Sequence, residues 1–102
     1  MNPTTEYYRL ELIANHTVQE AVFEALGKLG AGKYWTLLRD VDGCGSSGSR
    51  MGDGVWPEEN YLMVLYADLQ ESNRIAEAIR EVKSLYPIEG IKLFRSPAEC
   101  LV

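Results

Sequence analysis

The chain has few cysteines, a single histidine and no long apolar run among its 102 residues. Cys44 and Cys100 are far apart and belong to no C-x-x-C pair, so neither a disulfide framework nor a zinc site built from cysteines is expected. No stretch approaches the roughly 20 apolar residues of a membrane span, and residues 1–6 lack the basic and apolar regions of a signal peptide. These absences favour a cytoplasmic protein.

An excess of basic residues is also missing. Ten Lys and Arg residues stand against fifteen Asp and Glu residues, the net charge is −5 at pH 7, and the basic residues are scattered along the chain. Such a chain would repel a phosphate backbone, so nucleic acid is not an expected partner. The one histidine lies on a different predicted element from Cys44 and the serines, so the sequence offers no catalytic triad and an enzyme is not expected.

What is present is the composition of an ordinary globular protein, with 46% hydrophobic and 25% charged residues. A chain of this length can bury one core but not two, so residues 1–102 are expected to form a single domain. Period-two alternation, or an apolar run without breakers, predicts four strands. Their expected ranges are 7–14, 34–41, 62–67 and 88–95, the last closed by Pro97.

Apolar residues at helical spacing predict two helices between these strands. The first is expected over 17–29, with Thr17 and Glu20 forming a capping box. The second is expected to start at a cap on Asp68 or Ser72 and to end before Pro87. This order predicts an α+β protein of the ferredoxin-like, split-βαβ class (βαββαβ), with a four-stranded antiparallel sheet and two helices on one face.

The second and third strands have too few polar residues to supply a solvated side of the sheet. The apolar excess includes Trp35, Leu37, Leu62 and Val64, which cannot all point at the helices. A surface for self-association is therefore expected on the uncovered face. The alternative is that some of these side chains merely cover the rim of the sheet.

Residues 43–60 form a long glycine-rich loop, expected between the two central strands. It opens with the run Gly43-Cys44-Gly45-Ser46-Ser47-Gly48-Ser49-Arg50. Glycines let backbone N–H groups converge on an anion, serine hydroxyls add donors, and Arg50 adds a positive charge, so a phosphate or carboxylate ligand is one hypothesis. A flexible linker has the same composition and is the other. The segment is not a P-loop, because no Gly-Lys-Ser/Thr follows.

The run from Val41 to Gly48 resembles the V-x-G-x-G-x-x-x-G segment that opens the T-loop of PII nitrogen-regulatory proteins, with the last glycine one residue early. The order of elements agrees with that family over nearly the whole chain. The resemblance implies a homotrimeric signalling protein that takes part in nitrogen regulation. It also implies an adenine nucleotide effector, ATP, ADP or AMP, in clefts between subunits, and a protein target for the loop.

Carried over by position, the resemblance places Gly43, Gly45, Ser46 and Ser47 at the ligand cleft, and Gly48 and Arg50 complete the loop side of the expected site. Gly90 and Lys92 are similar to the family's G-K-I-F at the last strand, where the lysine meets phosphate. Ser46 and Ser47 stand where the family has arginine and glutamine, which indicates a divergent member. No tyrosine lies in residues 50–60, so uridylylation is not expected.

Three further features leave alternatives open. Trp56 could contact a protein partner or fold back onto the sheet. Asp53, Glu58 and Glu59 could bind a metal or form a solvated loop edge. His16 and Cys44 would be the ligands if the chain were instead similar to trimeric metal-binding proteins of the CutA type. A module whose loop binds only protein is the remaining alternative.

Overall fold

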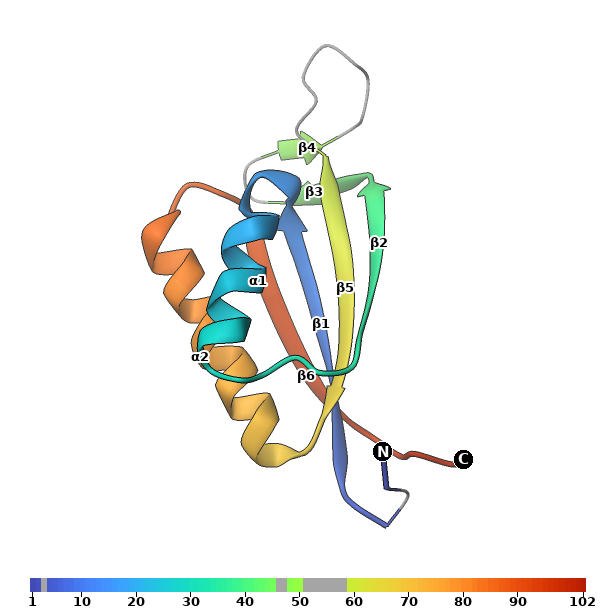
Figure 1. The fold of residues 1–102 in the computed structure, drawn as a ribbon. Coiled ribbons are helices and arrows are strands. Elements are labelled where there is room, and N and C mark those ends of the chain that lie inside the picture. The colour runs from blue at the N-terminus through green and yellow to red at the C-terminus, as the bar shows by residue number, and fades with distance from the viewer. Residues whose placement is uncertain (3, 46–47, 51–58) are drawn as a thin grey trace.

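The computed structural model describes residues 1–2, 4–45, 48–50 and 59–102. The elements in chain order are β1 (Tyr7–Asn15), η1 (His16–Val18), α1 (Gln19–Lys28), β2 (Trp35–Val41), β3 (Gly43–Gly45), β4 (Gly48–Arg50), β5 (Asn60–Ala67), α2 (Leu69–Leu85) and β6 (Ile91–Ala98). Four strands form one sheet in the order β2-β5-β1-β6, with every neighbouring pair antiparallel. Both helices cover the same face of this sheet (Figure 1). The predicted ferredoxin-like α+β class is confirmed.

The 43–60 segment does not join two central strands, as the sequence suggested. β2 is an edge strand, and the segment connects it to the central strand β5. A short hairpin was also not predicted: β3 pairs with β4, with Gly43 opposite Arg50 and Gly45 opposite Gly48. This hairpin lies at one end of the sheet, and the two chain termini lie at the other end (Figure 1).

The first helix begins differently from the prediction. The Asn15 side chain accepts a hydrogen bond of 3.0 Å from the backbone N–H of Thr17, and residues 16–18 form a 3-10 turn. α1 then starts at Gln19 with no side-chain cap. The capping box of Thr17 and Glu20 is therefore wrong, because Asn15, two residues before Thr17, caps the 3-10 turn instead. For α2 the first candidate is right: Asp68 accepts from the backbone N–H of Glu71 at 2.8 Å.

The last strand starts three residues later than expected and includes Pro97. Lys83 holds the preceding turn through hydrogen bonds to the carbonyls of Pro87 and Glu89, at 2.9 and 2.8 Å. Pro97 is tolerated because β6 is an edge strand, paired only with β1 inside this sheet, so a missing N–H can face outward. Pro97 therefore does not close the strand.

The core lies between the sheet and the helices. Alternate residues of β1 and β5 supply its sheet side, and the apolar stripes of α1 and α2 supply the other. Its members include Leu10, Leu12, Tyr61, Met63, Leu65, Val22, Leu26, Ile75, Ile79 and Val82. No helix in the described ranges is long and apolar enough to cross a membrane.

The uncovered face of the sheet carries an apolar row across three strands. Leu38 lies opposite Leu62, and Leu62 lies opposite Ile13. Val64 and Phe94 flank Glu11 on the same face. We call these five apolar residues the open-face patch; Leu38 is 54% and Phe94 is 59% exposed. The predicted excess of apolar residues on the uncovered face is thus present.

The other two residues expected to contribute to this surplus face the helices. Trp35 and Leu37 are paired with the buried Leu65 and Met63, so they lie on the helix side of the sheet. The Trp35 ring meets Phe23 of α1 edge-on, with centroids 5.1 Å apart. Two of the four apolar residues that the sequence analysis named therefore belong to the covered face.

Candidate functional site

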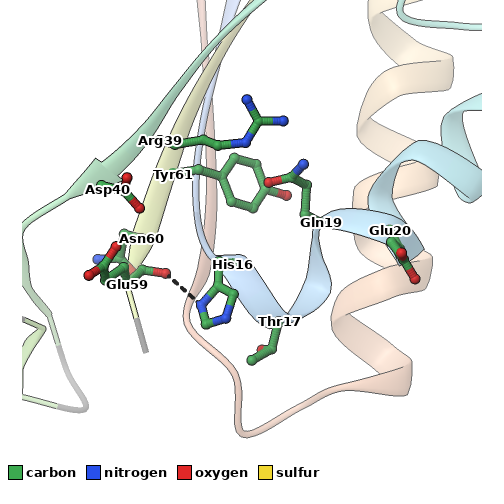
Figure 2. Close-up of a pocket in the computed structure, with 9 residues that line it drawn as sticks. All are labelled: His16, Thr17, Gln19, Glu20, Arg39, Asp40, Glu59, Asn60 and Tyr61. Atoms are coloured by element: carbon green, nitrogen blue, oxygen red, sulfur yellow. Dashed lines mark hydrogen bonds between the residues drawn. The ribbon is translucent and has the colours of Figure 1, made fainter. Parts of the chain in front are cut away.

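A pocket lies at the end of the sheet where residues 43–60 leave β2 and return to β5. Its volume is about 430 Å³, and its walls come from η1, the first turn of α1, the end of β2 and the start of β5. We call it the loop-base pocket. Figure 2 shows its lining side chains, with Arg39 and Asp40 from β2, His16 from η1 and Tyr61 from β5.

Backbone hydrogen bonds fix the walls relative to one another. The N–H of His16 donates to the carbonyl of Glu59 at 2.7 Å, and the His16 ring nitrogen Nδ1 lies 3.3 Å from the same oxygen (Figure 2). The N–H of Asn15 donates to the carbonyl of Gly90 at 3.0 Å. The end of β1 therefore holds both the return of the long loop and the turn before β6.

Two carboxyl groups meet at this pocket. Asp40 has φ 59°, the left-handed region that non-glycine residues seldom adopt, and it sits at a register shift between Leu38 and Val41. The resulting bulge brings its carboxyl into a hydrogen bond with that of Glu59. This bond, together with repulsion from the Asp40 charge, raises the pKa of Glu59 above its ordinary value.

Other charges act on the same carboxyl. Partial desolvation and the nearby Asp42 also raise the pKa of Glu59, whereas the His16 ring opposes the rise. Arg39 adds a positive charge to the lining, and it has no ion-pair partner in the part of the chain that the structure describes. The pocket thus presents charges of both signs.

A buried hydroxyl group lies beneath the pocket. Tyr61 is fully buried, and burial raises the pKa of its phenol. Among the described residues neither its hydroxyl nor the side-chain amide nitrogen of Asn15 has a hydrogen-bond partner. Figure 2 shows the Tyr61 ring pointing from β5 toward the start of α1, whose first turn has no side-chain cap. Unpaired buried polar groups are costly, so these two groups lower the stability of the fold at this end of the sheet.

The structure brings together only part of the predicted ligand site. Gly43, Gly45, Gly48 and Arg50 lie on the β3–β4 hairpin, while Ser46 and Ser47 lie outside the described residues. Gly90 is at the same end of the sheet, through its bond to Asn15, and Lys92 pairs with Ile13 on the open face. Their role in ligand binding stays a prediction.

The remaining candidates divide in the same way. Trp56, Asp53 and Glu58 lie outside the described residues, and His16 and Glu59 line the loop-base pocket. Within the described ranges no group of three or more His, Cys, Asp or Glu side chains is arranged to hold a metal ion. The sequence reasoning passed over Arg39, Asp40 and Tyr61. Charged residues at the end of a strand that enters a glycine-rich loop were the available signal for the first two.

Comparison with known proteins shows the fold. Neither a family model nor a curated protein matches the sequence. Among solved structures, CPII from Thiomonas intermedia K12, a nitrogen regulatory PII-like protein bound to ADP, AMP and bicarbonate, matches with a TM-score of 0.75 and 14% identity, over 93% of this chain and 88% of that one. Arabidopsis thaliana PII bound to citrate matches with a TM-score of 0.69 and 20% identity, over 93% and 79%.

B. subtilis GlnK in complex with ATP matches with a TM-score of 0.67 and 18% identity, over 91% of this chain and 82% of that one. The sheet order and the placement of the helices define a ferredoxin-like protein. Within that class, the chain has the fold of PII and PII-like proteins. The resemblance predicted from the sequence is confirmed at the level of the fold.

Proposed function

We propose that this chain is a PII-like regulatory protein that binds an anionic small molecule, foremost an adenine nucleotide, in clefts between subunits of a homotrimer. The observation that supports this most is the match to CPII along nearly the whole chain, because that structure is bound to ADP, AMP and bicarbonate. The complex of GlnK with ATP and that of PII with citrate also favour an anionic ligand.

The open-face patch supplies the reason for self-association. Exposed apolar side chains gathered on an uncovered sheet face gain free energy when another copy covers them. Three copies around a closed axis would cover all patches and leave seams between neighbours. The ends of β5 and β6 would then bring Lys92 and the β3–β4 hairpin toward such a seam.

The loop couples the ligand to a partner in this proposal. Residues 43–60 leave and return at the loop-base pocket, so a ligand bound at the hairpin acts on the point from which the whole loop departs. A bound anion that favours one loop arrangement shifts the population toward it. The loop, with Trp56, then contacts a protein target in the cytoplasm only in that state.

Thermal unfolding with added ligand tests the proposal. ATP, ADP, AMP and bicarbonate are added separately, and a ligand that binds the folded trimer raises the melting temperature by mass action, with about 2.7 kcal/mol of added stability at 100 times Kd. Lys92→Ala should abolish the nucleotide effect, whereas Lys28→Ala, at the far end of α1, should retain it.

Two results would contradict the proposal. One is the absence of any shift at millimolar nucleotide. The other is a shift with zinc or copper alone that is lost in His16→Ala, because this is the outcome expected of a metal-binding protein of the CutA type.

A further inference from the structure

A second pocket lies between α2 and the edge strand β6, on the helix side of the sheet. Its volume is about 290 Å³, and it shares no lining residue with the loop-base pocket. Arg80 and Arg95 line it, together with the amide of Asn73 and an apolar wall that includes Ala76 and Leu93. We call it the arginine groove.

Arg95 is held in place by neutral groups. Its Nη1 donates to the Ser72 hydroxyl at 3.1 Å and to the Asn73 side-chain oxygen at 2.8 Å. Its guanidinium carbon lies 5.4 Å from the centroid of the Tyr8 ring. None of these contacts neutralises the positive charge, and guanidinium has five N–H donors, so donors remain for a ligand.

Arg80 faces the same groove from α2. Asn73, Ala76 and Arg80 are three and four residues apart, which puts them on one side of the helix. In the described ranges neither Arg80 nor Arg95 takes part in an ion pair, although the chain carries fifteen acidic residues. Glu77 is near in sequence but does not line the groove.

We infer that the arginine groove binds a small organic anion, with its carboxylate or phosphate group between Arg80 and Arg95 and its carbon part against Ala76 and Leu93. Guanidinium groups recognise planar and tetrahedral oxyanions through paired N–H donors, and a fixed guanidinium loses little entropy when it does so. The apolar wall distinguishes an organic anion from an inorganic one. The volume suits a small metabolite. This site is separate from the nucleotide cleft of the proposed function.

Titration of the ¹⁵N-labelled chain with phenyl phosphate tests the inference, because the probe combines an oxyanion with an apolar ring. The expected result is saturable shifts of the amide signals of residues 73–80 and 93–95. Inorganic phosphate should bind the same residues more weakly. Arg80→Gln should weaken phenyl phosphate about tenfold or more, as for loss of one charge-assisted hydrogen bond.

Arg74→Gln is the matched control, since Arg74 is on the same helix and does not line the groove. It removes the same charge and should leave the affinity unchanged. Equal weakening by both variants, or signal changes that map elsewhere, would overturn the inference. A change in subunit number caused by Arg80→Gln would also overturn it, because the groove would then be a contact between copies. Failure of nucleotide binding would not affect these outcomes.

Discussion

At the scale of single residues, Asp40 combines two unfavourable features at the point where β2 gives way to the long loop. Its backbone is in the left-handed region, and its carboxyl faces that of Glu59. Each feature costs free energy, and such costs persist where the surrounding structure enforces them. The strain and the acid pair therefore lie where the loop leaves the sheet and where it returns.

Replacing Asp40 with asparagine should stabilise the protein at neutral pH. Asparagine adopts the left-handed conformation readily and removes the like charge. The pKa of Glu59 is raised in the folded protein, so ionising Glu59 costs stability as the pH rises from its ordinary pKa of 4.5 through the raised value. The gain in melting temperature of Asp40→Asn should therefore be largest near pH 7 and should shrink below about pH 4.

Thermal unfolding over this pH range checks the prediction, with Glu77→Gln, an exposed carboxyl of α2, as the control. The control should show no such pH dependence. An Asp40→Asn variant less stable than the parent at neutral pH would contradict the description of the acid pair.

These residues also show which features of the site could not be predicted from the sequence. The glycines and Arg50 were identified because their composition is unusual, whereas Asp40 is distinguished only by a positive φ at a bulge between β2 and β5. The unpaired, buried hydroxyl of Tyr61 is likewise visible only in the folded structure. Both depend on the pairing of strands distant in sequence, which no local pattern encodes.

At the scale of elements, one carboxylate of α2 holds the connection between α1 and β2 in place. Glu71, in the first turn of α2, is buried, and its Oε2 accepts hydrogen bonds from the backbone N–H groups of Gly32 and Lys33 at 2.9 and 3.0 Å. Gly32 has φ 79°, and a Cβ there would lie 3.2 Å from Leu26 and 3.3 Å from Leu65. The connection is thus packed closely against the core and held by Glu71.

Glu71→Ala should destabilise the protein by about 2 kcal/mol, since two backbone donors lose a charged acceptor. Glu71→Gln keeps an acceptor oxygen and should cost less. Urea unfolding measures both, and Glu77→Ala, an exposed glutamate on the same helix, should change stability little. Equal costs for the alanine variants at 71 and 77 would show that Glu71 does not hold this connection.

The elements themselves were largely predictable because their apolar periodicity is strong, and all four sheet strands and both helices are found. The errors lie at boundaries. Asn15 displaced Thr17 as the cap, and the turn held by Lys83 delayed β6. Pro97 fits inside β6 because β6 is an edge strand, and the order of the strands in the sheet cannot be seen in the local sequence. The β3–β4 hairpin was missed because glycine and serine have low strand propensity.

At the scale of the whole molecule, the covered and uncovered faces of the sheet differ in what completes them. The helices bury one face, whereas the open-face patch has no covering element among the described residues. Arg9 and Glu11, 3.6 Å apart, and Lys92 are on this face too, so the apolar row is interrupted by charges. Apolar contact would provide the free energy of association, and the charges would fix the register of the copies.

Analytical ultracentrifugation of the purified chain tests the central claim most directly, since the proposed ligand clefts exist only between subunits. The account predicts a species of three subunits at micromolar concentration. Leu62→Glu, which places a charge at the centre of the open-face patch, should dissociate it, and Gln70→Glu, which adds the same charge on exposed α2, should not. A single-subunit parent chain, or a trimer unaffected by Leu62→Glu, would contradict the account.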